Sequence, residues 1–304
     1  MRISSASIFA LGAYDMSNLQ SSLQKQQLQI DNQTRIVTPS DDAVAATEIL
    51  QLNESSGRND QFKTNSQTAQ SQLSFASTAV QNATNLVTEI QTLAIQAGNA
   101  SLAAPQRLDM QSELAQKFAA LISNANATDG SGIYLFGGNQ LDKPPFIADP
   151  AMNVTYQGDT GQRQLAITDS QTVPISEAGT LIFGDPSNPP TVFSNIQALS
   201  NLLQQDPKPA TYDSQLSSII SGLADSQTQI QTAGAAIGAQ QQAAQVAETT
   251  STSLDDQFQQ AIGNLQNLDM PKAISQFSMT RTSLQYAQQA YVKVTGLSLF
   301  NYIN

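Results

Sequence analysis

The chain has 304 residues, of which 40% are hydrophobic and 12% are charged, and this is enough apolar material for one to three domains. It contains no cysteine, histidine or tryptophan, which excludes disulfides, thiolate nucleophiles, imidazole bases and metal sites built from Cys or His. A formal net charge of −11 disfavours nucleic acid as a partner. No run approaches the roughly 18 apolar residues of a membrane span, so we expect neither membrane insertion nor a cleaved signal peptide.

The N-terminal segment has the spacing of an amphipathic helix. Met16, Leu19, Leu23 and Ile30 follow one another at intervals of three, four and seven residues, and Gln26 occupies the position that the longest interval skips. This period keeps one face of a helix turned toward a partner helix. We therefore predict a packing seam along this segment.

The next residues are typical of a helix start, and this predicted motif consists of Thr38, Pro39, Ser40, Asp41 and Asp42. Thr38 can serve as the N-cap with Pro39 at the first helical position and Asp41 at the third, a variant of the capping box; Ser40 is the alternative cap. Both carboxylates then lie in the first turn, where the helix dipole favours negative charge. Neighbouring side chains on a helix diverge, so we expect no catalytic, metal or cofactor site here.

Two further stretches predict a helical hairpin. Apolar or alanine residues recur every three or four positions from Ala69 to Ala97, and Gly98 with Asn99 then provides a helix stop. A shorter stretch with the same period returns at residues 114–125, after Pro105 has opened a new turn.

The longest seam extends from Ile219 to Leu268 and would span about 75 Å as one helix, at 1.5 Å per residue. Alanine fills many of its positions, which favours a close approach of the partner helix. Gly234, Gly238 and Gly263 interrupt the pattern. Each glycine costs about 1 kcal/mol relative to alanine, so a bend or break in this helix stays an alternative.

Residues 131–193 have a different character. GIYLFGG, TVPI and GTLIFG are short β-prone runs separated by turn residues. The runs NVTY and RQLAI alternate on either side of Gly158–Gly161, which predicts a β-hairpin whose turn is this loop. We expect the loop to be a turn and not a site for calcium or a sugar. The stretch QQDPKP at residues 204–209 predicts a turn before the longest helix.

The C-terminal segment begins after Asp269, a good N-cap candidate, and its apolar stripe continues into the tail LSLFNYI at residues 297–303. The residues that we expect to pack between subunits lie in the two terminal segments. They are Met16, Leu19, Leu23, Ile30, Phe277, Leu284, Tyr291, Val294, Leu297, Leu299 and Phe300.

Neither terminal segment has enough apolar material to be stable by itself. Ordering the backbone costs on the order of 1–2 kcal/mol per residue, whereas each large apolar side chain that becomes buried returns roughly 1.5–3 kcal/mol. We therefore expect residues 1–30 and 280–304 to be poorly ordered in a free subunit. They would order by packing on each other and on neighbouring subunits.

Together these patterns predict a mainly α fold (α+β overall). The N- and C-terminal halves form a long, coiled-coil-like helical rod that carries a small inserted β domain. The expected division comprises terminal helical segments (1–40 and 270–304), a helical rod domain (41–135 and 197–269) and the β domain (136–196).

Six short motifs are distributed from one end of the chain to the other. They are MRIS at the start, Arg-Ile-x-x-Pro-Ser-Asp-Asp at 35–42, Asn-x-x-x-Ala-x-Ser-x-Leu at 65–73, Ala-Gly-Asn at 97–99, Tyr-Gln-Gly-Asp-x-Gly-x-Arg at 156–163 and Ser-Leu-Phe-Asn-Tyr at 298–302. Each is weak alone. In combination they resemble the family of bacterial flagellar hook–filament junction proteins called hook-associated protein 3, in the flagellin-like superfamily.

This resemblance implies a structural, non-enzymatic role outside the cell, without a cofactor. The family self-assembles into a helical layer between the first hook-associated protein and the flagellin filament, with the terminal helices forming an inner tube. Its members leave the cell through the flagellar type III apparatus without a cleaved signal. A flagellar export chaperone holds their C-terminal segment, and an amphipathic helix suits such groove binding.

Three alternatives stay open. The Asp-Asp-Ala form of residues 41–43 also occurs in flagellin, so a filament subunit is the runner-up. An enzyme in the β region, such as a glycosidase, would need paired carboxylates, but the acidic residues there are scattered in turn-like contexts. A cytosolic coiled-coil scaffold would share the helical pattern without depending on export.

Overall fold

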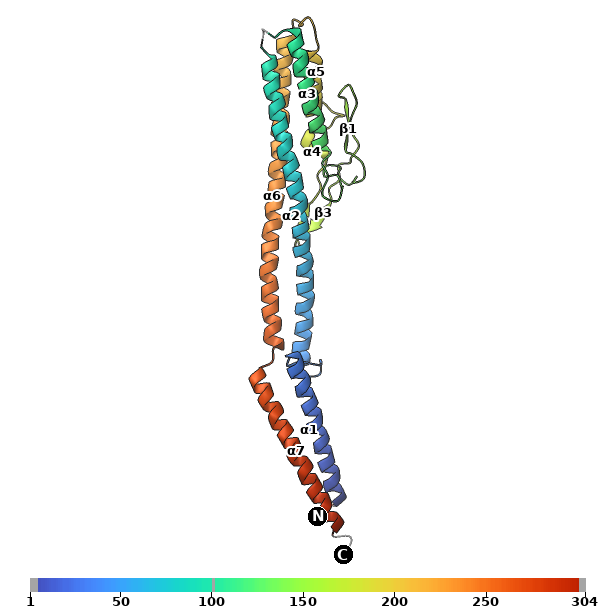
Figure 1. Ribbon diagram of the computed structural model, residues 1–304, viewed down its shortest axis with the longest axis vertical. Coiled ribbons are helices and arrows are strands. Elements are labelled where there is room, and N and C mark those ends of the chain that lie inside the picture. Colours follow the sequence, from blue (N-terminus) through green and yellow to red (C-terminus); the bar gives the residue numbers. More distant parts are fainter. Residues whose placement is uncertain (1–4, 100–101, 301–304) are drawn as a thin grey trace. The chain divides into compact units, whose positions relative to one another are not determined.

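The computed structural model describes residues 5–99 and 102–300 and consists mainly of helices, with four short strands among these residues (Figure 1). The chain divides into two compact units. Unit 1 comprises residues 1–58 and 254–304, and unit 2 comprises residues 59–253. The predicted class, mainly α with a small β component, is confirmed.

Unit 1 is built on the two terminal helices, α1 (Ser5–Asn32) and α7 (Met270–Phe300), which lie side by side and antiparallel (Figure 1). It also holds the first residues of α2 (Ala43–Ala97) and the last residues of α6 (Tyr212–Gln266). Asp269 caps α7 as predicted, because its carboxylate accepts a hydrogen bond from the backbone N–H of Lys272 at 3.1 Å.

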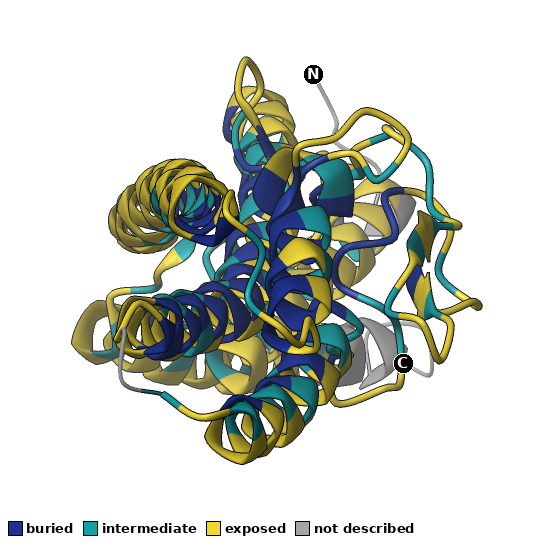
Figure 2. Ribbon diagram, turned by 90° about the horizontal axis from the view of Figure 1, so that it is seen from above, coloured by how far each residue is buried: buried dark blue, intermediate teal, exposed yellow. Residues whose placement is uncertain are grey.

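Unit 2 packs α2 and α6 with α3 (Ala104–Ala125) and α5 (Val192–Leu203). The buried faces of these helices point toward one another, as the dark blue segments of Figure 2 show. The predicted hairpin is confirmed, since α2 ends immediately before Gly98 and the chain returns as α3. The turn predicted at residues 204–209 is confirmed as well, because it joins α5 to α6.

The long helix α6 is continuous for 55 residues. Its glycines therefore produce no break. Gly234 instead allows close packing, because a Cβ there would lie 3.1 Å from Cγ1 of Val80 on α2. Part of the seam is polar: Asn59 is buried and donates from Nδ2 to the backbone oxygen of Ser251 at 2.7 Å. A buried amide of this kind favours one register of two packed helices.

A cluster of phenylalanines forms the centre of unit 2 where the helices meet the strand region. Phe146 is 1% exposed, and its ring centroid lies 5.2 Å from that of Phe193 and 5.5 Å from that of Phe183. Phe136 is also fully buried and contacts Phe183 edge to face. Edge-to-face and tilted contacts at such distances are the favoured arrangements of aromatic rings.

The four strands form two separate hairpins, and the predicted pairing across Gly158–Gly161 is wrong. β1 (Phe146–Ala148) pairs with β2 (Val154–Tyr156), and β3 (Gln164–Ala166) pairs with β4 (Thr172–Pro174), both antiparallel. The loop between β2 and β3 bonds to earlier residues instead. The backbone N–H of Gln157 donates to the carbonyl of Pro145 at 2.7 Å, which holds the chain away from a hairpin turn.

Two other predictions for this region are wrong or incomplete. GTLIFG contains the short helix α4 (Gly179–Phe183) where a β-prone run was expected. The run GIYLFGG forms isolated bridges, Thr128 with Tyr134 and Gly137 with Ala178, in place of a strand. Helix α5 has no counterpart among the predicted helices, although Thr191 and Ser194 cap each other's backbone N–H groups at its start, at 3.2 and 2.7 Å.

Candidate assembly surfaces

The predicted packing residues of the two terminal helices face each other. Every one of them with a described side chain is half-buried except Val294, which is 45% exposed. Phe9 and Tyr291 make an edge-to-face contact across the pair at 6.3 Å. The half-buried residues are Met16, Leu19, Leu23 and Ile30 on α1 and Phe277, Leu284 and Tyr291 on α7. Leu297, Leu299 and Phe300 lie outside the residues whose side chains are described.

The α1–α7 pair leaves much of its apolar surface uncovered. No described side chain of α1 is buried, and on α7 only Ala273 is, at 8% exposure. Tyr14 on α1 and Met279 and Tyr286 on α7 are 65%, 59% and 67% exposed. Exposed apolar residues that follow one face of a helix are typical of protein interaction surfaces.

Arg35 ties the segment between α1 and α2 to the end of α6. Its Nε–H donates to the backbone oxygen of Leu265 at 2.7 Å, and its backbone N–H donates to that of Gln266 at 2.9 Å. Its Nη1 pairs with the carboxylate of Asp42 at 2.9 Å. Lys25 on α1 pairs with the neighbouring Asp41 at 2.6 Å. We call these four side chains, Lys25, Arg35, Asp41 and Asp42, the joint cluster.

Helix α2 begins at Ala43, and its N-cap is Asp42, whose Oδ1 accepts from the backbone N–H of Ala45 at 3.0 Å. The predicted caps Thr38 and Ser40 are therefore wrong, and so is the placement of both carboxylates in the first turn, because Asp41 and Asp42 precede the first helical residue. The reason is a tight turn before the helix: the N–H of Asp41 donates to the carbonyl of Thr38 at 2.9 Å, and Pro39 takes the corner position that proline favours.

The carboxylate of Asp41 closes this turn. It accepts from the backbone N–H groups of Val37 at 3.0 Å and Thr38 at 3.1 Å. Hydrogen bonds from Lys25 and then from these two N–H groups hold the pKa of Asp41 well below its ordinary value. The N–H of Ala45 and then the guanidinium of Arg35 lower the pKa of Asp42. Both aspartates are consequently ionised at neutral pH and act as hydrogen-bond acceptors that shape the backbone.

The motif at residues 156–163 makes a set of hydrogen bonds in unit 2, through Tyr156 and Asp159, that we call the lock. The hydroxyl of Tyr156 lies 2.9 Å from the carbonyl oxygen of Phe136 and accepts from the N–H of Gly179 at 3.2 Å. The carboxylate of Asp159 accepts from the N–H groups of Asn139 and Gly161, both at 2.8 Å. The loop therefore joins the β2 hairpin to the segment before it and to the start of α4.

One glycine in this lock has no substitute. Gly138 has a φ of 68°, and an added Cβ would overlap with the backbone and the carboxylate of Asp159. The joint cluster contains one residue that the sequence patterns did not single out, Lys25, whereas Arg35 opens the motif at 35–42 and pairs with a carboxylate of the same motif. No local signal identifies Lys25, because Asp41 lies 16 positions away in the sequence and meets it only after the chain has turned.

Within residues 5–99 and 102–300, no group of three or more acidic side chains is arranged to hold a metal ion. None of the helices in those ranges is long and apolar enough to cross a membrane.

Comparison with known proteins supports the resemblance that the motifs predict. The family model for the bacterial flagellin N-terminal helical region matches residues 10–141. The flagellar hook-associated protein 3 of Escherichia coli K12 is 24% identical over 323 residues, and the match covers 99% of each chain. The chain resembles hook-associated protein 3 along nearly its whole length.

Solved structures share the fold. A flagellar hook-associated protein from Vibrio parahaemolyticus, described as putative, has a TM-score of 0.68 at 17% identity, over 75% of this chain and 100% of that one. The flagellar junction protein FlgL from Legionella pneumophila has a TM-score of 0.61 at 17% identity, over 72% of this chain and 100% of that one. Since the matched proteins are covered almost completely, the likeness is not confined to one helical segment.

Proposed function

We propose that this protein is a structural subunit of the bacterial flagellum that acts as an adaptor at the hook–filament junction. The observation that carries the proposal is the apolar surface of α1 and α7, which these helices leave uncovered when they pack on each other alone. The similarity to hook-associated protein 3 over 99% of the chain supports the same role.

The mechanism is helix packing between copies. Each large apolar side chain that a neighbour covers contributes roughly 1.5–3 kcal/mol, and Leu11, Tyr14, Met279 and Tyr286 each have more than half of their surface available. Contacts between two different surface patches produce a helical assembly when the rotation does not close a ring. Such a layer suits a position between two helical structures.

The distribution of charge supports assembly through unit 1. Unit 1 has nine acidic and seven basic residues, so its net charge is small, whereas unit 2 has 15 acidic and six basic residues. Like charges repel across an interface, so close lateral packing of unit 2 against unit 2 is the costlier arrangement. We infer that residues 1–40 and 270–304 form the inner tube, residues 41–135 and 197–269 the wall, and residues 136–196 a domain that projects from it.

The proposed partners are other copies of this chain, the first hook-associated protein and flagellin. The proposed location is outside the cell, after export through the flagellar type III apparatus without a cleaved signal. A cytoplasmic export chaperone would hold the apolar stripe of α7 before export, in the manner of a groove that binds an amphipathic helix. The role requires no enzymatic activity, because each of its steps is a packing event.

Immunogold labelling of intact flagella tests the location. A band of label confined to the boundary between hook and filament is the expected result. Deletion of the gene should leave intact hooks and release unpolymerised flagellin into the medium. Label along the whole filament would contradict the proposal and support a filament subunit, which the match of residues 10–141 to the flagellin N-terminal region favours as the second candidate.

Amide hydrogen exchange tests the packing mechanism separately from the location. In the free subunit we expect fast exchange in residues 1–30 and 280–304, because neither helix is fully covered there, and slow exchange in the core of unit 2. On assembly the terminal residues should become protected. Slow exchange of both terminal segments in the monomer would show that they need no neighbour to order.

A further inference from the structure

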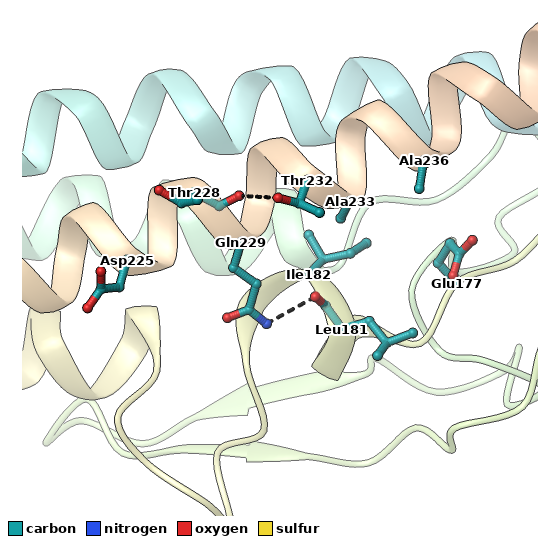
Figure 3. Close-up of a pocket in the computed structure, with 9 residues that line it drawn as sticks. All are labelled: Glu177, Leu181, Ile182, Asp225, Thr228, Gln229, Thr232, Ala233 and Ala236. Carbon is teal, nitrogen blue, oxygen red and sulfur yellow. Dashed lines mark hydrogen bonds between the residues drawn. The ribbon is translucent and has the colours of Figure 1, made fainter.

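A groove of about 460 Å³ lies between α4 and α6 in unit 2 (Figure 3). Leu181 and Ile182 contribute one wall, and Ala233 and Ala236 line the side formed by α6. The volume falls within the range of pockets that hold small ligands and gives room for about two large side chains. The groove is separate from the apolar surface of α1 and α7, which belongs to unit 1.

Core packing does not explain why residue 181 is a leucine. It is 57% exposed, whereas Ile182 and Phe183 on the same short helix are each 1% exposed. Its backbone oxygen accepts from the side-chain amide of Gln229 at 3.0 Å, which fixes α4 against α6 at this point (Figure 3). The leucine side chain is therefore presented at the groove by a held backbone and is available to a partner.

Carboxylates lie at both ends of the groove, Asp225 at one and Glu177 at the other (Figure 3). Glu177 is 9% exposed and receives hydrogen bonds from the side-chain amides of Gln162 at 2.7 Å and Gln240 at 3.1 Å. Neither carboxylate belongs to any ion pair within the described part of the chain. A nearly buried carboxylate that only neutral donors contact is strongly complementary to a cation.

We propose that this groove docks a polypeptide segment of another protein, one that carries a large apolar side chain between basic residues. The apolar side chain would pack on Leu181, Ile182 and the two alanines, and the basic groups would pair with Asp225 and Glu177. A second copy of this chain is the less suitable occupant. Unit 2 has 15 acidic and six basic residues, so two copies of unit 2 would repel each other electrostatically. This inference does not rest on the proposed function.

Methyl NMR on the full chain, labelled at leucine and isoleucine, tests the groove with three synthetic hexapeptides. The basic probe is acetyl-Lys-Ala-Leu-Leu-Ala-Arg-amide. The acidic probe has glutamate in place of both basic residues, and the polar probe has serine in place of both leucines. Saturable shifts of the Leu181 and Ile182 methyls with the basic probe alone are expected, and they should weaken as salt is added.

Substitutions assign the binding to the groove. We expect L181S to lower the affinity for the basic probe about tenfold, because most of the apolar contact is lost, and D225N to lower it about two- to fivefold, since this carboxylate is exposed. Matched controls are L108S, at a leucine that is 50% exposed on α3, and D169N in an exposed loop. Both should keep the wild-type affinity, and the methyl spectrum should show that all four variants stay folded.

Three results would overturn the proposal. One is the absence of saturable shifts at these methyls up to millimolar concentrations of the basic probe. Another is equal binding of the acidic probe, which would remove the role of the carboxylates. The third is a shift of the Leu181 methyls with protein concentration in the absence of peptide, which would show that a second copy occupies the groove.

Discussion

The two units of this protein bury their apolar side chains to very different degrees. Unit 2 has a core of phenylalanine, leucine and isoleucine side chains, many of them less than 2% exposed. In unit 1 most of the predicted packing residues of α1 and α7 are only half-buried, and Val294 is exposed. Unit 2 is therefore built to be stable within one chain, whereas unit 1 has an apolar surface that a neighbouring subunit would complete.

The largest expected effect is the loss of an aromatic side chain from the core of unit 2. F146A should lower the free energy of unfolding by about 3–5 kcal/mol, because it removes a buried ring and leaves a cavity among Tyr156, Phe183 and Phe193. Urea unfolding followed by circular dichroism measures the change. The control is Y286A on α7, which removes an aromatic side chain that is 67% exposed and should cost less than about 0.5 kcal/mol. If F146A and Y286A lowered the free energy of unfolding equally, the contrast in burial between the two units would be contradicted.

The lock at the Tyr156 hydroxyl should give a smaller effect. Y156F removes only the oxygen, and the N–H of Gly179 keeps its bond to the carbonyl of Phe136 at 2.9 Å, so each group loses its second partner in a partly buried site. We expect a loss of about 0.5–1.5 kcal/mol in the same urea experiment, the net contribution of a hydrogen bond whose removal leaves no group unsatisfied. Y286F is the matched control and should be neutral. A neutral result for Y156F would mean that water replaces the hydroxyl, and that the lock is not a source of stability in unit 2.

Acid should weaken the joint cluster of unit 1. The folded-state pKa values of Asp41 and Asp42 lie below the ordinary value of 3.8, so their stabilising contribution is complete above pH 3.8 and is lost as the pH falls through the folded values. Carbon-13 NMR of the carboxyl groups should show both midpoints below 3.8. The variant K25M should move the Asp41 midpoint upward and leave the Asp42 midpoint nearly unchanged. Midpoints at the ordinary value would show that the joint cluster does not form in solution.

The smallest effect on stability is expected for Y286S in unit 1, which should nevertheless have a large effect on assembly. Y286S should change the free energy of unfolding of the free chain by less than about 0.5 kcal/mol, because the side chain is already exposed. It should nevertheless reduce self-assembly, measured by sedimentation at rising protein concentration. L181S removes an apolar side chain of unit 2 that is also more than half exposed, at 57%, and should assemble normally. If the two variants assembled equally well, the apolar surface of unit 1 would not be the contact between copies.

The periodic helices were predictable because their signal is local and repeated. The seam of α6 recurs through many turns, so serine or glutamine at a few positions did not obscure it, and its glycines did not break the helix. The cap at Asp269 was also readable, since it depends on residues within four positions. At residues 38–42 the same kind of local reasoning identified the helix start but chose the wrong cap. The turn that displaces the predicted cap is closed by the carboxylate of Asp41, whose ion-pair partner Lys25 lies 16 positions away in the sequence.

The strand region shows where local reasoning fails. Strands of three residues carry almost no periodic signal, so the alternation around Gly158–Gly161 suggested one hairpin where two exist. The same loop is held by residues 137–139 and 179, and no local pattern predicts this contact.

The amino-acid sequence by itself determined that this chain is built from long helices with apolar seams at both ends, because helical periodicity is a property of neighbouring residues. Its motifs also determined the resemblance to hook-associated protein 3. Only the tertiary structure decided which carboxylate caps α2, how the short strands pair, and that Leu181 faces a groove between two carboxylates. The physical reason is that hydrogen bonds and burial depend on which distant segments meet, and several partners compete for the same polar group until the chain has folded.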